Sequence, residues 1–192
     1  MTPKTTTLIH KSTVCILRLG LLSSLAAAAP LLAAGAGASD SGHDQSAPAT
    51  LVQIVREATQ RFADVNAATA AGYAPAFGCV TGPDDGAMGV HYINGALVSG
   101  GEINAKEPQA LIYEPEGKAM RLVGVEFIAL ADNWLAAHQQ TPPILEGQLL
   151  QYIGTPNRYW LPGLFELHVW AWRDNPLGAF VDWNTHVTCE HE

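Results

Sequence analysis

The chain has 192 residues and a formal net charge of −8, from 18 acidic and ten basic side chains. Binding nucleic acid or an anionic lipid surface through phosphate groups needs clustered Lys and Arg, so this charge argues against both as partners. About 150 residues follow the N-terminal segment described next, which is enough for one hydrophobic core and hardly for two. We therefore expect a single globular domain over residues 50–192.

Residues 1–38 have the composition of a secretory signal peptide. Three basic residues and no acidic ones accompany an apolar run over residues 19–34, and small residues then offer cleavage after Ala36 or Ala38. An uncleaved membrane anchor is the alternative, but polar residues and Pro30 interrupt the run, which is shorter than the ~20 residues of a spanning helix. We predict a periplasmic or secreted protein without a stable membrane span. Cleavage removes three basic residues and no acidic ones, so the net charge changes from −8 to −11.

Cleavage also removes Cys15 and leaves two cysteines, Cys79 and Cys189. Only one pairing is then available, and in an oxidising compartment such a pair predicts a disulfide bond. The alternative is a pair of soft metal ligands beside His186 and His191.

The N-terminal half of the mature chain begins with a tether and a helix. Residues 39–49 are small and polar, which predicts a flexible tether. Residues 50–71 carry apolar side chains at helical spacing, and Thr50 and Gln53 have the spacing of a capping box, so we expect one helix here. Residues 73–86 are rich in Gly, Pro and Asp, which favours a loop.

The period of the sequence then changes from helical to strand-like. Short segments rich in β-branched and aromatic residues, each bounded by Gly, Pro or Asp, predict strands over residues 87–94, 109–115, 120–130 and 164–172. Residues 132–138 and 176–183 are expected to form a short helix and a final helical turn. This order predicts an α+β fold in which an N-terminal helix is followed by a curved antiparallel sheet or partial barrel.

Three of these predicted strands each place an ionisable residue among apolar neighbours: His91, Glu126 and His168. Two neutral imidazoles and a carboxylate can bind a divalent metal and leave coordination positions open, as in a catalytic zinc site or a facial triad. The alternative is a metal-free arrangement in which the carboxylate pairs with a protonated histidine or the histidines donate to backbone carbonyls.

Two functions from different classes follow. In the first, the protein is an exported metalloprotein in which His91, Glu126 and His168 bind a divalent metal of unknown identity. If this metalloprotein is an enzyme, Glu102 or Glu166 is its general base. In the second, it is a non-catalytic module that binds a small molecule in an aromatic-lined pocket. The aromatic candidates, for which core and interface packing is the commoner explanation, are Tyr152, Tyr159, Trp160, Trp170, Trp172 and Trp183.

Several strings in the chain resemble those of a widespread family of uncharacterised secreted proteins. They are GVHYIN at 89–94, EPQALIYEP at 107–115, LVGVE at 122–126 and LHVWAW at 167–172, followed by Asn175-Pro176. The resemblance extends from about Tyr73 to Cys189. It implies a single extracytoplasmic domain, and because the family has no assigned activity it transfers no catalytic residue.

Overall fold

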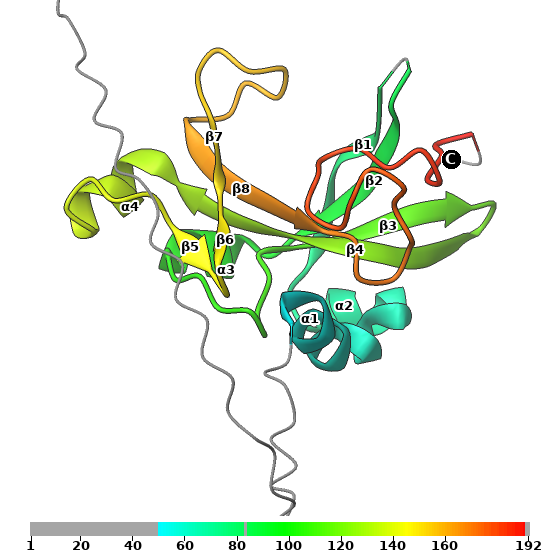
Figure 1. Ribbon diagram of the computed structural model, residues 1–192. Coiled ribbons are helices and arrows are strands. Elements are labelled where there is room, and N and C mark those ends of the chain that lie inside the picture. The colour runs from blue at the N-terminus through cyan, green and yellow to red at the C-terminus, as the bar shows by residue number, and fades with distance from the viewer. Residues whose placement is uncertain (1–49, 83, 191–192) are drawn as a thin grey trace, which may run out of the picture. The chain divides into compact units, whose positions relative to one another are not determined.

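The computed structural model describes residues 50–82 and 84–190 (Figure 1). The predicted signal peptide and tether lie outside the described residues. The elements in chain order are α1 (Leu51–Thr59), the 3-10 helix η1 (Gln60–Ala63), α2 (Val65–Ala70), β1 (Ala74–Gly82), β2 (Gly86–Ile93), α3 (Gly95–Gly100), β3 (Ala110–Glu116), β4 (Ala119–Leu130), α4 (Ala131–Ala137), β5 (Ile144–Leu145), β6 (Gln148–Leu149), β7 (Gln151–Ile153) and β8 (Leu164–Val169). None of the helices in this described part is long and apolar enough to cross a bilayer.

Six strands form one curled antiparallel sheet in the order β1-β2-β3-β4-β8-β7, and β5 and β6 pair separately. Helices α1 and α2 pack on one side of this sheet (Figure 1). The predicted α+β fold, with helix first and a curved antiparallel sheet after it, is confirmed. Strand β8 lies beside β4 although the segment between them contains α4 and three short strands.

The predicted N-terminal helix is present but divided. Its capping box forms as expected, with the Thr50 backbone N–H donating to Gln53 Oε1 at 2.8 Å and the Gln53 backbone N–H donating to Thr50 Oγ1 at 3.4 Å. The helix ends at η1, and Asp64 then caps α2 by accepting from the Asn66 backbone N–H at 2.9 Å. Asp competes for backbone N–H groups in this way, so it favours a new helix start over continuation.

Residues 73–86 were predicted as a loop, and this prediction is wrong, because β1 occupies most of them. The strand tolerates Pro75 because it is an edge strand with only β2 as a neighbour. Its pairing register shifts between Ala76 and Cys79, where Phe77 and Gly78 both have positive φ angles, 67° and 65°. The Gly- and Pro-rich composition therefore marks a bulge within a strand.

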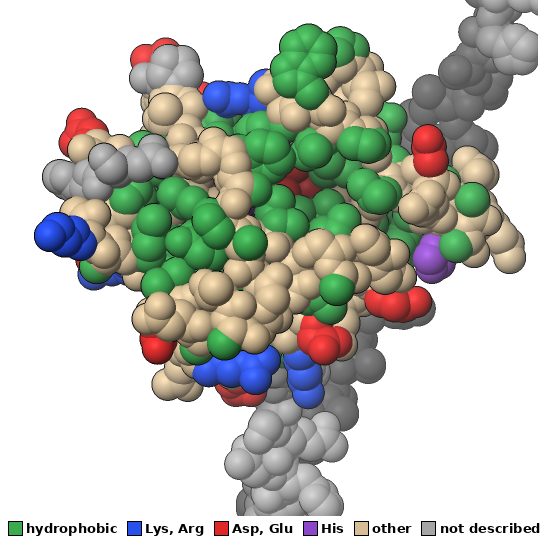
Figure 2. Space-filling model, turned by 180° about the vertical axis from the view of Figure 1, so that it is seen from behind, with side chains coloured by type: hydrophobic (Ala, Val, Ile, Leu, Met, Phe, Trp, Pro, Cys, Tyr) green, Lys and Arg blue, Asp and Glu red, His purple; other side chains and the backbone are tan. Residues whose placement is uncertain are grey.

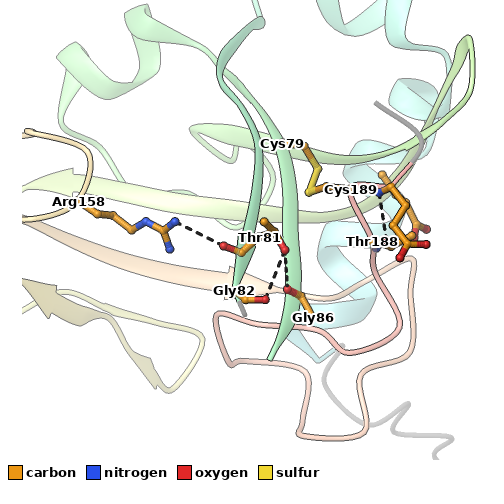
Figure 3. The surroundings of a disulfide bond; sticks show 9 residues. Cys79, Thr81, Gly82, Gly86, Arg158, Thr188 and Cys189 are labelled. Atoms are coloured by element: carbon orange, nitrogen blue, oxygen red, sulfur yellow. Dashed lines mark hydrogen bonds between the residues drawn. A yellow bond between two sulfur atoms is a disulfide. The ribbon is translucent and has the colours of Figure 1, made fainter. Parts of the chain in front are cut away.

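The C-terminal segment lies beside the β1–β2 hairpin and is joined to it by the predicted disulfide (Figure 3). Cys79 and Cys189 have an S–S distance of 2.04 Å and are 110 residues apart. The Thr188 backbone N–H donates to Glu114 Oε1 on β3 at 3.0 Å. The disulfide excludes the two cysteines as metal ligands. The helical turn expected over residues 176–183 is absent, and this stretch consists of turns and bends.

Alternation along the strands divides the sheet into two faces. On β4, Val125 and Phe127 belong to the core that packs against α1 and α2, whereas Glu126 and Ile128 belong to the opposite face. We call these the helix face and the cavity face. The cavity face is the one that carries the predicted site.

Candidate metal centre

The sheet places the three predicted ligands on the cavity face of β2, β4 and β8. Glu126 and His168 are direct partners in the β4–β8 ladder, so their side chains start side by side. His91 comes from β2, and β3 runs between it and β4. Across β3, Glu126 lies opposite Ala110 and His91 lies opposite Ile112, so His91 approaches the other two ligands along a diagonal of the sheet.

The three side chains form a compact buried cluster. His91 Nε2 lies 3.4 Å from His168 Nε2 and 3.5 Å from Glu126 Oε2, and one candidate ligand atom of each residue lies within 4.8 Å of the others. The exposed fractions of His91, Glu126 and His168 are 6%, 6% and 1%. The structure therefore brings the predicted ligands together, and they could hold a metal ion.

Asp182 lies behind the cluster and was missed by the sequence analysis. Its Oδ1 is 3.5 Å from Nδ1 of His168, the ring nitrogen that points away from the other ligands. A carboxylate at this nitrogen is the usual partner of a metal-ligating histidine, because it keeps the proton on Nδ1 and frees Nε2 for the metal. Asp182 lies in an irregular segment without strand or helix periodicity, so no sequence pattern singles it out.

Burial and neighbouring charges shift the pKa values of the cluster in opposite directions. Desolvation lowers the pKa of His91, opposed by the nearby Glu126 carboxylate. Desolvation also acts downward on His168, but Glu126, Asp182 and Glu166 together outweigh it and raise its pKa to about 9. The pKa of Glu166 rises to about 8, mainly because the carboxyl group is desolvated and then because it faces Glu126. Without a metal, the cluster therefore holds one neutral and one protonated histidine at neutral pH.

The two predicted general bases have different locations. Glu166 is half-buried on the cavity face of β8, and its carboxylate lies within 4.8 Å of ring and carboxylate atoms of His168 and Asp182. Glu102 is exposed, does not line the cavity above the cluster, and has its backbone oxygen bonded to Gln109 Nε2. The structure thus brings Glu166 to the cluster and leaves Glu102 away from it.

A cavity of about 280 Å³ opens above the cluster. Figure 2 shows it as a hollow surrounded by hydrophobic side chains with an acidic group at its bottom, and Glu126 and Glu166 are the acidic residues that line it. The bulge of β1 contributes Phe77, whose ring lies 5.4 Å from that of Tyr159. The aliphatic residues of the lining are Val80, Ile93, Val98, Ile128, Leu130, Ile153, Leu161 and Leu164.

Of the six aromatic residues proposed to line a pocket, only Tyr159 lines this cavity. Trp170 is buried elsewhere, with its Nε1 donating to the Val181 oxygen, and Trp172 donates to Thr59 Oγ1. Trp160 is 89% exposed. The cavity is therefore lined mainly by aliphatic side chains, with the Phe77 and Tyr159 rings as its aromatic part.

Comparisons with family models, with curated protein sequences and with solved structures found no match. Any functional conclusion for this chain therefore depends on the geometry of its own residues.

Proposed function

We propose that this protein is an extracytoplasmic zinc-binding protein whose metal is held by His91 Nε2, His168 Nε2 and Glu126 Oε2. The observation that carries the proposal is the spacing of these atoms. Tetrahedral zinc with bonds of ~2.05 Å requires ligand atoms ~3.3 Å apart. The measured separations of His91 Nε2 from the other two atoms are 3.4 and 3.5 Å.

The donor set favours zinc over Mg²⁺ and Ca²⁺, which are bound mainly by oxygen ligands. Two nitrogens and one carboxylate oxygen are also a ligand set found in catalytic zinc sites. Asp182 supports the assignment, because it occupies the position of the outer carboxylate that orients a zinc-bound histidine.

Three protein ligands would leave a further coordination position for water or a substrate group. Zinc at such a site supplies Lewis acidity and an acidified water. Glu166 lines the same cavity beside His168 and is placed to take up or release a proton there, the role of the general acid or base in a hydrolytic reaction. We therefore propose metal-assisted hydrolysis as the reaction class.

The extracytoplasmic part of the proposal has separate support. Residues 1–38 have signal-peptide composition, and the Cys79–Cys189 disulfide is a bond that oxidising compartments maintain. Mass spectrometry of the protein from a periplasmic or culture fraction should give a chain that begins after Ala36 or Ala38. A full-length chain in the cytoplasmic fraction would contradict the location.

A pair of matched substitutions tests the metal assignment. Protein purified without an affinity tag should contain one zinc per chain, measured by elemental analysis. Glu126→Gln removes a ligand and should weaken zinc binding at least about 100-fold in calorimetric titration, more than loss of an outer partner does. Glu166→Gln makes the same chemical change on the same face and should keep stoichiometric zinc.

Two results would overturn the proposal. One is protein without stoichiometric zinc that also takes up none when zinc is added. The other is equal zinc affinity in the Glu126→Gln and unsubstituted proteins. Circular dichroism of each variant shows whether the fold is retained, so that loss of zinc is not confused with loss of the domain.

A further inference from the structure

The polar and apolar groups of the cavity are segregated. Four ionisable side chains, His91, Glu126, Glu166 and His168, gather on the sheet at its bottom. No Lys or Arg lines the cavity within the described residues. The positive charge available to an occupant is therefore that of the proposed zinc.

The polar side chains higher in the wall are already engaged. Asn157 donates through Nδ2 to the Gly154 and Leu161 oxygens at 3.1 and 2.9 Å, and its Oδ1 accepts from two backbone N–H groups of its own loop. The Tyr159 hydroxyl donates to Met88 Sδ at 3.7 Å. Ser99 is exposed at the rim. A polar body in the middle of the cavity would lose its hydrogen bonds to water without replacing them, which disfavours it.

The size of the cavity limits the occupant. An apolar cavity of roughly 150 Å³ holds one benzene molecule, so a cavity nearly twice as large accommodates about ten non-hydrogen atoms. The measured volume is about 280 Å³. A chain of about eight carbons, or one ring with a short chain, is the scale that fits.

The mouth is also apolar. Phe77 is 51% exposed and is held there by a positive φ angle of 67°, a backbone conformation that costs energy for a non-glycine residue. The bulge that carries Phe77 lies next to the pairing of Ala76 with His91, so it sits over the metal end of β2. A strained, half-exposed aromatic ring beside a pocket is a feature of ligand sites.

We propose that this cavity binds an amphiphilic small molecule, with one oxygen-bearing head group coordinated to the metal and an aliphatic or single-ring body filling the aliphatic chamber. This inference rests on the proposed zinc site, because the metal is the group that receives the head. The substrate class of the zinc site is then medium-chain or ring-bearing compounds with a carbonyl, carboxylate or hydroxamate end.

Two hydroxamates of different chain length test the inference. Zinc stoichiometry is measured first. Octanohydroxamic acid and acetohydroxamic acid are then titrated separately into the zinc-loaded protein by calorimetry. They share a metal-binding head and differ by six methylenes, so burial of the chain should make the longer probe at least about 100-fold tighter. Octanohydroxamic acid should bind at least about 100-fold more weakly to the zinc-free Glu126→Gln protein, where the head has no metal to bind.

A matched pair of tryptophan substitutions places the chain in the cavity. Val98 lines the cavity from α3, whereas Ala96 on the same helix is exposed and does not. Val98→Trp should reduce the chain-length preference to less than about fivefold, since the new ring occupies the space of the chain. Ala96→Trp should leave it unchanged. If Val98→Trp fails to fold, Ile153→Trp makes the same comparison, with Tyr152→Trp, on the opposite face of β7, as its control.

The outcomes separate the two proposals. If the protein binds zinc but has equal affinity for both hydroxamates, the proposal of an amphiphilic ligand is wrong and the proposed zinc site is retained. Tight octanohydroxamate binding that persists without zinc overturns the placement of the head on the metal. Absence of zinc binding overturns the proposed function and this inference with it.

Discussion

The buried polar groups on the two faces of the sheet differ in charge. On the helix face the buried hydroxyls are neutral and paired: Tyr73 donates to the Pro108 oxygen at 2.8 Å and Tyr113 to the Phe62 oxygen at 2.7 Å. On the cavity face the buried groups are ionisable, and the partners nearest to His91 Nε2 are His168 Nε2 at 3.4 Å and Glu126 Oε2 at 3.5 Å. Ionisable side chains are rarely buried together, so their concentration beside a cavity is typical of a binding or catalytic site.

We infer from this difference that the helix face mainly stabilises the fold and that the cavity face mainly binds a ligand. The helix face packs aliphatic and aromatic side chains against α1 and α2, as in an ordinary core. The cavity face leaves a wall of aliphatic groups in contact with open space and concentrates charge beneath it. If so, substitutions on one face should change stability without changing binding on the other.

The disulfide gives the largest expected effect. Cys79→Ser with Cys189→Ser should lower the free energy of unfolding by about 4 kcal/mol, because the closed loop of 110 residues restricts the unfolded chain. Zinc affinity of the folded protein should change less than about threefold, since its ligands lie on strands held by the sheet and not by the disulfide. Urea unfolding and zinc titration measure the two quantities. A folded variant that has lost zinc would show that the site depends on the β1 hairpin.

Two leucines of β8 compare the faces directly. Leu167 is buried in the core of the helix face and Leu164 lines the cavity, with almost equal exposure. Leu167→Ala should cost about 3 kcal/mol of unfolding free energy by opening a void in close packing. Leu164→Ala should cost about 1–2 kcal/mol, because its side chain already adjoins open space and has fewer contacts to lose. Equal costs, measured by urea unfolding, would contradict the distinction between the faces.

Tyr73 provides the smallest effect, and it depends on pH. Burial raises its pKa from 10.0 to about 12. In the unfolded chain the phenol ionises near its ordinary pKa, whereas the folded protein keeps it protonated. The contribution of Tyr73 to the free energy of unfolding is therefore complete below pH 10 and is lost as the pH rises toward 12. Tyr73→Phe should cost about 1 kcal/mol at neutral pH by removing the hydroxyl bonded to Pro108. It should also flatten the alkaline decline, measured by urea unfolding between about pH 9 and about pH 11. A decline as steep as in the unsubstituted protein would show that other groups cause it.

Local pattern was enough to predict much of the site. An alternation of period two identified His91, Glu126 and His168 as polar residues within apolar strands, and this required no knowledge of strand order. The cysteine count allowed one pairing, which formed. The same reasoning missed β1, because glycine and proline were interpreted as loop residues when they mark an edge strand with a bulge.

The sequence pattern could not predict which distant segments of the chain lie side by side. Glu102 and Glu166 were equally good candidates for a general base until β8 paired with β4 and placed only Glu166 in the cavity. Asp182 came to His168 from an irregular segment with no periodicity to reveal it. Neither result follows from neighbours in the chain, because each depends on which distant segments pack together.

By itself, the sequence determined the fold class, the strands that carry the three ligands and the single available disulfide, since these follow from periodicity and composition acting over a few residues. Tertiary structure alone decided that the three ligands converge on the cavity face, that Asp182 lies behind His168 and that a mainly aliphatic cavity opens above them. The physical reason is that ligand spacing and cavity shape depend on strand order and sheet curvature, which arise from packing among residues far apart in the chain.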